Sequence, residues 1–94
     1  MVHVVVRHEI EDYAKWKKEF DEGSADRKAA ASQGGAIYRT VDNPNKIAVA
    51  LDWDILENTQ KFTNSDEIKQ AMEKAGVIGA PQIIFSEKSD DVTE

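Results

Sequence analysis

The sequence contains no cysteine, which excludes a disulfide framework and thiolate chemistry. This absence fits a reducing compartment, and we expect a cytoplasmic location. A long apolar run is missing as well. The opening segment MVHVVVRHEI is short and carries charged side chains, unlike a signal peptide, and no stretch approaches the roughly 20 apolar residues of a membrane span.

Basic residues are outnumbered, because 12 Lys and Arg stand against 18 Asp and Glu and give a formal net charge of −6. The cations are interspersed with acids, as in residues 11–19, EDYAKWKKE. A protein that binds nucleic acid or an anionic membrane needs a basic stripe to neutralise phosphates. The composition therefore predicts that neither nucleic acid nor a membrane is a partner.

The length of 94 residues is enough for one domain and too short for two. A domain of this size buries only roughly 60–65% of its unfolded surface, so its core is thin and an oligomeric partner would stabilise it. We expect one domain over residues 1–88 and a flexible, acidic tail over residues 89–94, SDDVTE.

The first half of the chain predicts a strand, a helix and a second strand. β-Branched residues favour a strand over Val2–Glu9, with three valines on one face and His3 and Val5 on the other. Asp12 is placed to cap a helix that is predicted to run to about residue 32, because aromatic residues recur at helical spacing from position 13. The glycines at 34 and 35 are expected to end this helix before a strand over Ala36–Asp42.

The second half predicts a hairpin and two short helices before a last strand. A turn at residues 43–45, Asn-Pro-Asn, joins the second strand to a third over Lys46–Trp53. Asp54 and Asn64 each precede a glutamate by three residues, which is the spacing of a capping box. The final strand is predicted over Gln82–Lys88. The residues expected to be buried by the two helices are Ile55, Leu56, Phe62, Ile68, Met72 and Ala75.

The resulting order, β-α-β-β-α-β, is typical of the ferredoxin-like α+β fold, with an antiparallel four-stranded sheet and helices on one face. The other face is left uncovered, although it carries apolar residues such as Val5. Large exposed apolar patches mark interfaces. The sequence therefore predicts a homodimer that forms through the sheet.

The segment Leu51-Asp52-Trp53-Asp54, followed by ILENTQKF and then NSDE, resembles the antibiotic biosynthesis monooxygenase family. The order of elements is also similar to the wider dimeric α/β-barrel superfamily over almost the whole chain. The resemblance implies a homodimer with one pocket in each subunit. Some members oxidise polycyclic aromatics without metal or flavin, so the resemblance implies no cofactor.

Other members of that family degrade haem with a His on the helix after the Trp strand and an Asn on the first strand. This sequence departs from that pattern. The helix carries Thr59, Gln60 and Lys61 but no His, and the first strand has no Asn. The resemblance therefore argues against haem as a substrate and leaves Trp53 as the matching residue.

His3 is the candidate catalytic residue, because an imidazole with a pKa near 6.5 both accepts and donates protons. Asp52, on a neighbouring strand, is placed to orient it. The alternative is a solvated histidine or one in a dimer interface. The second histidine, His8, lies five positions further on and faces the opposite side of the strand, so the two histidines cannot share a metal ion, and no metal site is expected.

Arg7 and Tyr38 are candidate ligand-binding residues together with Asp52 and Trp53. Arg7, alone or with Arg39, is suited to bind an anion through its guanidinium. The alternative for the arginines is pairing with carboxylates across the strands. Tyr38 either donates to an oxygen in a pocket or covers a core edge with its hydroxyl in water.

Four aromatic residues, Trp16, Phe20, Trp53 and Phe62, fit either an aromatic ligand site or an ordinary core. Two functions remain open on the sequence alone. The first is a cofactor-independent, monooxygenase-like enzyme that acts on or binds a small apolar or aromatic molecule, with His3 as proton carrier. The second is a non-catalytic small-molecule-binding or stress-related domain with the same dimer.

Overall fold

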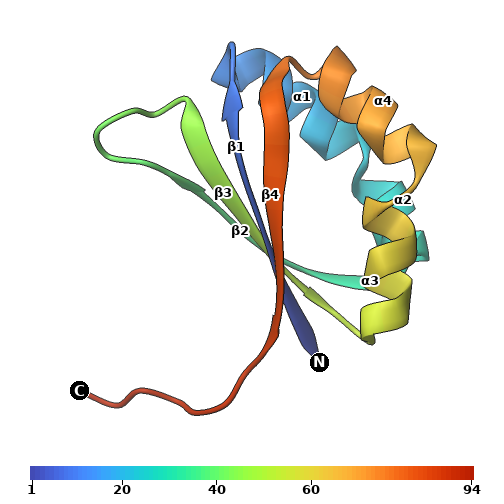
Figure 1. Cartoon of the computed structure of the whole chain (residues 1–94), viewed down its shortest axis with the longest axis vertical. Helices are drawn as coiled ribbons and strands as arrows, with labels where there is room; N and C mark the ends of the chain where they lie inside the picture. The colour runs from blue at the N-terminus through green and yellow to red at the C-terminus, as the bar shows by residue number, and fades with distance from the viewer.

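The computed structural model describes residues 1–94 and consists of one four-stranded sheet with four helices (Figure 1). The sheet is antiparallel, with strand order β2-β3-β1-β4, which confirms the ferredoxin-like α+β fold. Its elements in chain order are β1 (Val2–Ile10), α1 (Tyr13–Glu22), α2 (Ser24–Ala29), β2 (Ser32–Arg39), β3 (Lys46–Trp53), α3 (Leu56–Thr63), α4 (Asp66–Lys74) and β4 (Val77–Glu87).

All four helices lie on one face of the sheet, and the other face is uncovered (Figure 1). We call the uncovered side the open face. Alternation along β1 turns Val2, Val4 and Val6 to the helices, where each is buried. The core lies between sheet and helices and consists of these valines with Ile10, Trp16, Ile47, Val49, Trp53 and Ala75.

The helix predicted from Asp12 to about residue 32 is interrupted, and that prediction is wrong in its second half. Asp12 caps α1 as expected, since its Oδ1 accepts from the amide of Ala14 at 3.0 Å. Gly23 then ends α1, and its amide donates to carbonyls of the last turn. The left-handed residue before β2 is Ala31, with φ of 82°, and not Gly34 or its neighbour.

Both glycines lie inside β2, which begins earlier than the predicted Ala36. Gly34 has φ of 88° and sits at a shift in the register between β2 and β3. At Gly35 the two strands are so close that a Cβ would lie 1.8 Å from the carbonyl oxygen of Ala50. Glycine is needed here for close approach of two backbones, which sequence spacing does not distinguish from a helix end.

The third strand has the predicted bounds, but the helix caps that follow it differ. Asp54 does not cap α3, because its carboxylate accepts instead from the amide of Ile55 and the side chain of Asn58. Ser65, one residue after the predicted Asn64, caps α4 through a bond from the amide of Ile68.

Ile55 and Leu56 are 52% and 43% exposed, so the expectation that α3 buries them is wrong. They lie at the start of α3, outside the helical face that carries Phe62 to the core. The last strand begins at Val77, before the predicted Gln82, and pairs with β1 around an irregularity. No helix is long and apolar enough to cross a membrane.

Residues 88–94 follow β4 without helix or strand. In Figure 1 this segment leads away from the sheet on the side opposite the helices. The division of the chain into a domain over residues 1–88 and a flexible tail stays a prediction.

Candidate functional site

A cavity of about 450 Å³ lies between the sheet and the helices. Its lining is mostly apolar and comes from β1, β3 and all four helices. The sheet contributes Val4, Val6, Val49 and Leu51. We call this space the aromatic cavity, because all four aromatic residues singled out in the sequence border it: Trp16, Phe20, Trp53 and Phe62.

These aromatic residues are grouped in two pairs. The rings of Trp16 and Phe20 stack, with centroids 5.0 Å apart. Those of Trp53 and Phe62 are tilted, with centroids 5.2 Å apart. Such pairs stabilise a core by packing. Here they also border a space large enough for a small ligand. Their place in the core is confirmed, whereas an aromatic ligand site stays a prediction.

Trp53 is held in place by burial and by one hydrogen bond. It is 1% exposed, and its indole Nε1 donates to the carbonyl oxygen of Ala30 at 2.7 Å. This bond ties the end of β3 to the segment between α2 and β2. Trp53 is the only predicted ligand-binding residue that lines the aromatic cavity.

His8 lines the same cavity, on the helix side of β1. Its ring lies 5.8 Å from that of Trp16, centroid to centroid. Neither ring nitrogen has a hydrogen-bond partner, although both are shielded from solvent. Burial lowers the pKa of His8 below the ordinary 6.5, because an imidazolium loses hydration there.

The place of His8 in the cavity was not predicted from the sequence, where this residue was considered only as a metal ligand. The opposite orientations of His3 and His8 are confirmed. His8 occupies an even-numbered position of β1, in line with Val4 and Val6. The signal that could have indicated this place is a histidine in line with the apolar side chains of one strand face.

We predict that His8 makes folding pH-dependent. Because its pKa is lowered in the folded state, the unfolded chain binds a proton near pH 6.5 before the folded one does. The free energy of unfolding should therefore be highest above pH 6.5 and fall as the pH decreases toward the folded pKa. Urea unfolding from pH 7.5 to 5 measures this. His8→Gln should flatten the profile in that range.

The matched control for this prediction is His3→Gln, which removes the other histidine and leaves His8 buried. This variant should keep the fall in stability below pH 6.5. An unchanged profile in His8→Gln would show that His8 does not cause it.

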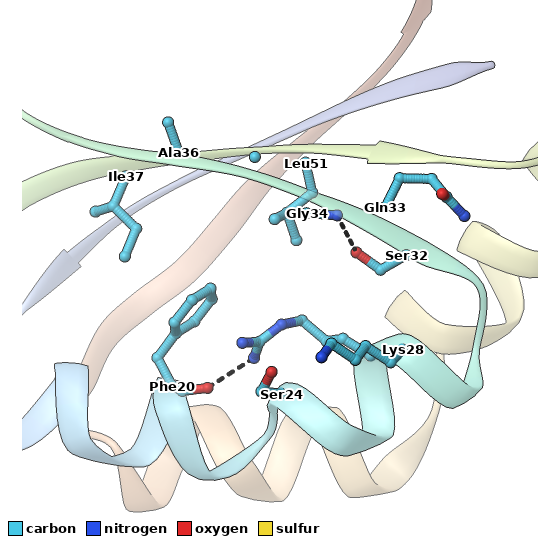
Figure 2. Close-up of a pocket in the computed structure, with 11 residues that line it drawn as sticks. Phe20, Ser24, Lys28, Ser32, Gln33, Gly34, Ala36, Ile37 and Leu51 are labelled. Carbon is cyan, nitrogen blue, oxygen red and sulfur yellow. Dashed lines mark hydrogen bonds between the residues drawn. The ribbon is translucent and has the colours of Figure 1, made fainter.

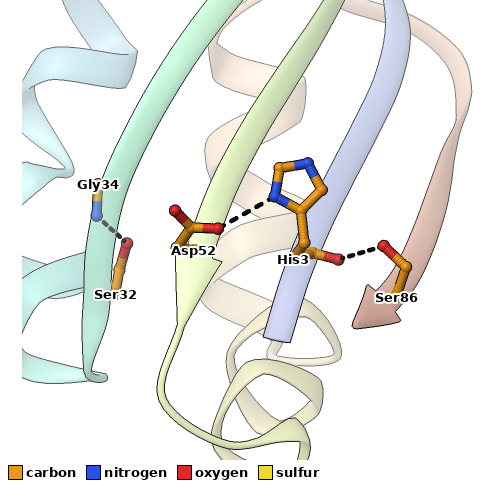
Figure 3. Close-up of polar contacts among 5 residues, drawn as sticks. All are labelled: His3, Ser32, Gly34, Asp52 and Ser86. Carbon is orange, nitrogen blue, oxygen red and sulfur yellow. Dashed lines mark hydrogen bonds and ion pairs between the residues drawn. The ribbon is translucent and has the colours of Figure 1, made fainter. Parts of the chain in front are cut away.

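His3 lies on the open face, away from the aromatic cavity (Figure 3). Its Nδ1 donates to Oδ1 of Asp52 at 3.0 Å, so the predicted orienting carboxylate is in place. Both side chains are about half exposed, at 45% and 49%. On the other side of His3, the hydroxyl of Ser86 donates to its carbonyl oxygen at 3.2 Å (Figure 3). Neither residue of this pair lines the aromatic cavity.

Arg7 and Tyr38 are also on the open face, and both are exposed. Arg39 faces the helices instead, with its guanidinium 4.0 Å from the ring centroid of Tyr13 and a bond to the carbonyl of Pro44. The prediction that Arg7 and Arg39 hold one anion together is therefore wrong, because their register places them on opposite faces. Neither arginine forms an ion pair across the strands.

No group of three or more His, Asp and Glu side chains converges where a metal ion could bind. Around the aromatic cavity the charged side chains are Glu19, Asp26, Arg27 and Glu67. Glu19 pairs with Lys74 at 3.6 Å. None of these charged side chains pairs with His8, and its lowered pKa favours the neutral imidazole.

No protein-family model matches this chain, and no curated protein matches it in sequence. Solved structures do share its fold. A protein from Bordetella bronchiseptica assigned as an antibiotic biosynthesis monooxygenase superimposes with a TM-score of 0.78 at 15% identity, over 94% of this chain and 96% of that one. One from Caulobacter crescentus with the same assignment gives 0.73 at 18% identity, over 95% and 90%.

A third similar structure is SnoaB, a cofactor-independent oxygenase from Streptomyces nogalater. It superimposes with a TM-score of 0.75 at 12% identity, over 99% of this chain and 97% of that one. At these identities the likeness shows a shared fold. Two of these structures carry the assignment of the family that the sequence resembles, and what they share with this chain is the fold.

Proposed function

We propose that this protein binds a small apolar aromatic molecule in the aromatic cavity and oxidises it with molecular oxygen, without a cofactor. The observation that carries the proposal is the imidazole of His8, which has no hydrogen-bond partner and lies in the apolar wall of a cavity of about 450 Å³. Ligand sites have volumes of about 300–1,000 Å³ and combine an apolar lining with a few polar groups. The fold shared with a cofactor-independent oxygenase supports the same reading.

His8 is suited to act as the proton acceptor. Its lowered pKa keeps it neutral at pH 7, so a ring nitrogen is free to take a proton from an acidic ligand. An anthrone or a related activated methylene compound becomes an electron-rich anion when it loses that proton. The overall reaction, R₂CH₂ + O₂ → R₂C=O + H₂O, balances with the substrate as the only reductant.

Binding and turnover are tested separately. Because the two tryptophans of the chain, Trp16 and Trp53, both border the cavity, 1-naphthol should quench the intrinsic fluorescence when it binds. Oxygen uptake with 1,8-dihydroxyanthrone measures turnover. We expect His8→Gln to lower oxygen uptake by about 10²–10⁴-fold, the usual contribution of a general base, while quenching by naphthol persists.

The matched control is His3→Gln, which should leave oxygen uptake unchanged because His3 lies on the other face of the sheet. If this variant lost activity instead of His8→Gln, the site would lie on the open face. Quenching without any oxygen uptake would favour the non-catalytic binding domain. Absence of both would contradict a ligand site in the aromatic cavity.

The protein is further proposed to be a homodimer in which two open faces pack together. A row of apolar side chains crosses all four strands on this face, with Ala36 beside Ala50, Ala50 beside Val5, and Val5 beside Ile84. Ile84 is 42% exposed in one chain. A row of this kind, uncovered in a small domain, fits a second copy.

The charges of the open face suit self-association. Along the two central strands, Arg7 and Lys46 are balanced by Glu9 and Asp52, although the whole chain carries −6. Two copies can therefore meet without net repulsion on this side. His3 would then be an interface residue, oriented by Asp52. The location in the cytoplasm stays a prediction.

A further inference from the structure

A second cavity, of about 370 Å³, lies between α2 and the edge strand β2 (Figure 2). It shares Phe20, Arg27 and Leu51 with the wall of the aromatic cavity. Its only charged lining residues are Arg27 and Lys28, and no carboxylate borders it. We call it the basic cavity. Two cations without an acid are notable in a chain whose net charge is −6.

Arg27 is held in place without an ion pair. Its guanidinium lies 3.7 Å from the ring centroid of Phe20, and Nη1 donates to the Phe20 carbonyl at 2.7 Å. These contacts fix one face and one nitrogen, so other N–H donors of the fork remain available. Burial lowers the pKa of Arg27, although nearby Asp21 and Asp26 raise it. Neither aspartate forms an ion pair with Arg27 or lines the basic cavity.

The remaining lining divides into an apolar and a polar part. Phe20, Ile37 and Leu51 provide apolar side chains, and Figure 2 shows Phe20, Ile37 and Leu51 facing the same space. Gly34 and its neighbour Gly35 add no side chain there, which keeps the space open along β2. Polar side chains come from Ser24, Ser32 and Gln33.

We propose that the basic cavity binds a small aromatic carboxylate. Its carboxylate would be bound by Arg27 and Lys28, and its ring would lie against Ile37 and Leu51. A carboxylate matches the planar fork of an arginine, and an apolar body matches the rest of the lining. The two cavities share Phe20, Arg27 and Leu51, but the proposal does not depend on oxidation in the aromatic cavity, because it requires neither oxygen nor His8.

The probe is benzoate, titrated into ¹⁵N-labelled protein, with benzyl alcohol as its neutral counterpart. The amides of Gly34 and Gly35 should shift with benzoate and not with benzyl alcohol. Arg27→Gln should weaken benzoate binding about tenfold or more, since hydrogen bonds to charged groups are the strong ones. Lys28→Gln should weaken it less, because Lys28 is exposed.

The matched control is Lys18→Gln, which removes an exposed cation of α1 that borders neither cavity. It should bind benzoate as the unchanged protein does. If Arg27→Gln does not fold, the Lys28→Gln comparison and the benzyl alcohol comparison still decide. Equal shifts with benzoate and benzyl alcohol, or equal binding in Lys18→Gln and Lys28→Gln, would overturn the proposal. These readouts are independent of oxygen uptake, so either proposal can fail alone.

Discussion

Replacing Trp53 by alanine is expected to lower the free energy of unfolding by about 3–5 kcal/mol, the usual cost of truncating a buried aromatic side chain. The indole is 1% exposed and packs against Phe62, so its removal leaves a cavity in the core. It also removes the Nε1 donor and leaves the carbonyl of Ala30 without that bond. Because small domains have about 5–15 kcal/mol of stability in total, this change consumes much of it.

Trp53→Phe is the matched variant, because it keeps an aromatic ring and removes the indole donor. Urea unfolding followed by circular dichroism should place it between the unchanged protein and Trp53→Ala. Equal stability of Trp53→Phe and the unchanged protein would mean that the bond to Ala30 adds nothing. A loss below about 1 kcal/mol in Trp53→Ala would contradict the burial of the indole in the core.

Ala50→Arg is expected to convert the proposed dimer into a monomer. Ala50 lies in the apolar row of the open face, between Ala36 and Val5. An arginine in each copy would place two unpaired charges in a buried interface, which costs several kcal/mol and corresponds to about a thousandfold weaker association. Sedimentation velocity should show twice the 10.5 kDa of one chain for the unchanged protein and a single chain for the variant.

The control for the dimer is Ala25→Arg, an exposed position of α2 on the opposite side of the molecule. It should sediment like the unchanged protein. Circular dichroism of Ala50→Arg establishes that the chain still folds. If the unchanged protein sediments as a single chain at micromolar concentration, the open face is not a self-association surface.

The third strand was predictable because its side chains alternate strictly. The residues from Lys46 to Trp53 alternate apolar and small or polar side chains, and the strand has those bounds. The turn at residues 43–45 fixed the antiparallel hairpin, and the uncovered face followed from the order of elements. Such patterns depend only on nearby residues in the sequence, so they can be recognised without knowing which elements pack together.

The glycines were not predictable in the same way. A glycine is compatible with a helix end, a strand irregularity or close backbone approach, and the sequence does not tell these apart. Gly23 ended the first helix, whereas Gly35 serves the contact with Ala50. The left-handed position fell to Ala31, a residue that rarely adopts it.

The candidate site was predicted in part. The four aromatic residues were correctly grouped, because helix and strand periodicity places them on the covered side. His3 with Asp52 was correctly paired by register, yet which side of the sheet encloses a cavity depends on helix packing. Helix packing is not a local property, so the sequence did not indicate that His8, and not His3, lines the cavity. The roles of His3, Arg7 and Tyr38 remain predictions.

The end of α1 at Gly23 determines which element borders the two cavities. It separates a six-residue helix, α2, none of whose side chains is fully buried, and this helix borders both cavities. Its fixed contacts are those of Arg27 with Phe20 and, at its C-terminal end, the bond from Trp53 to the carbonyl of Ala30. Because α2 lines both cavities, a change in its position would alter both spaces at once, while the hydrogen-bonded sheet beneath would not need to change.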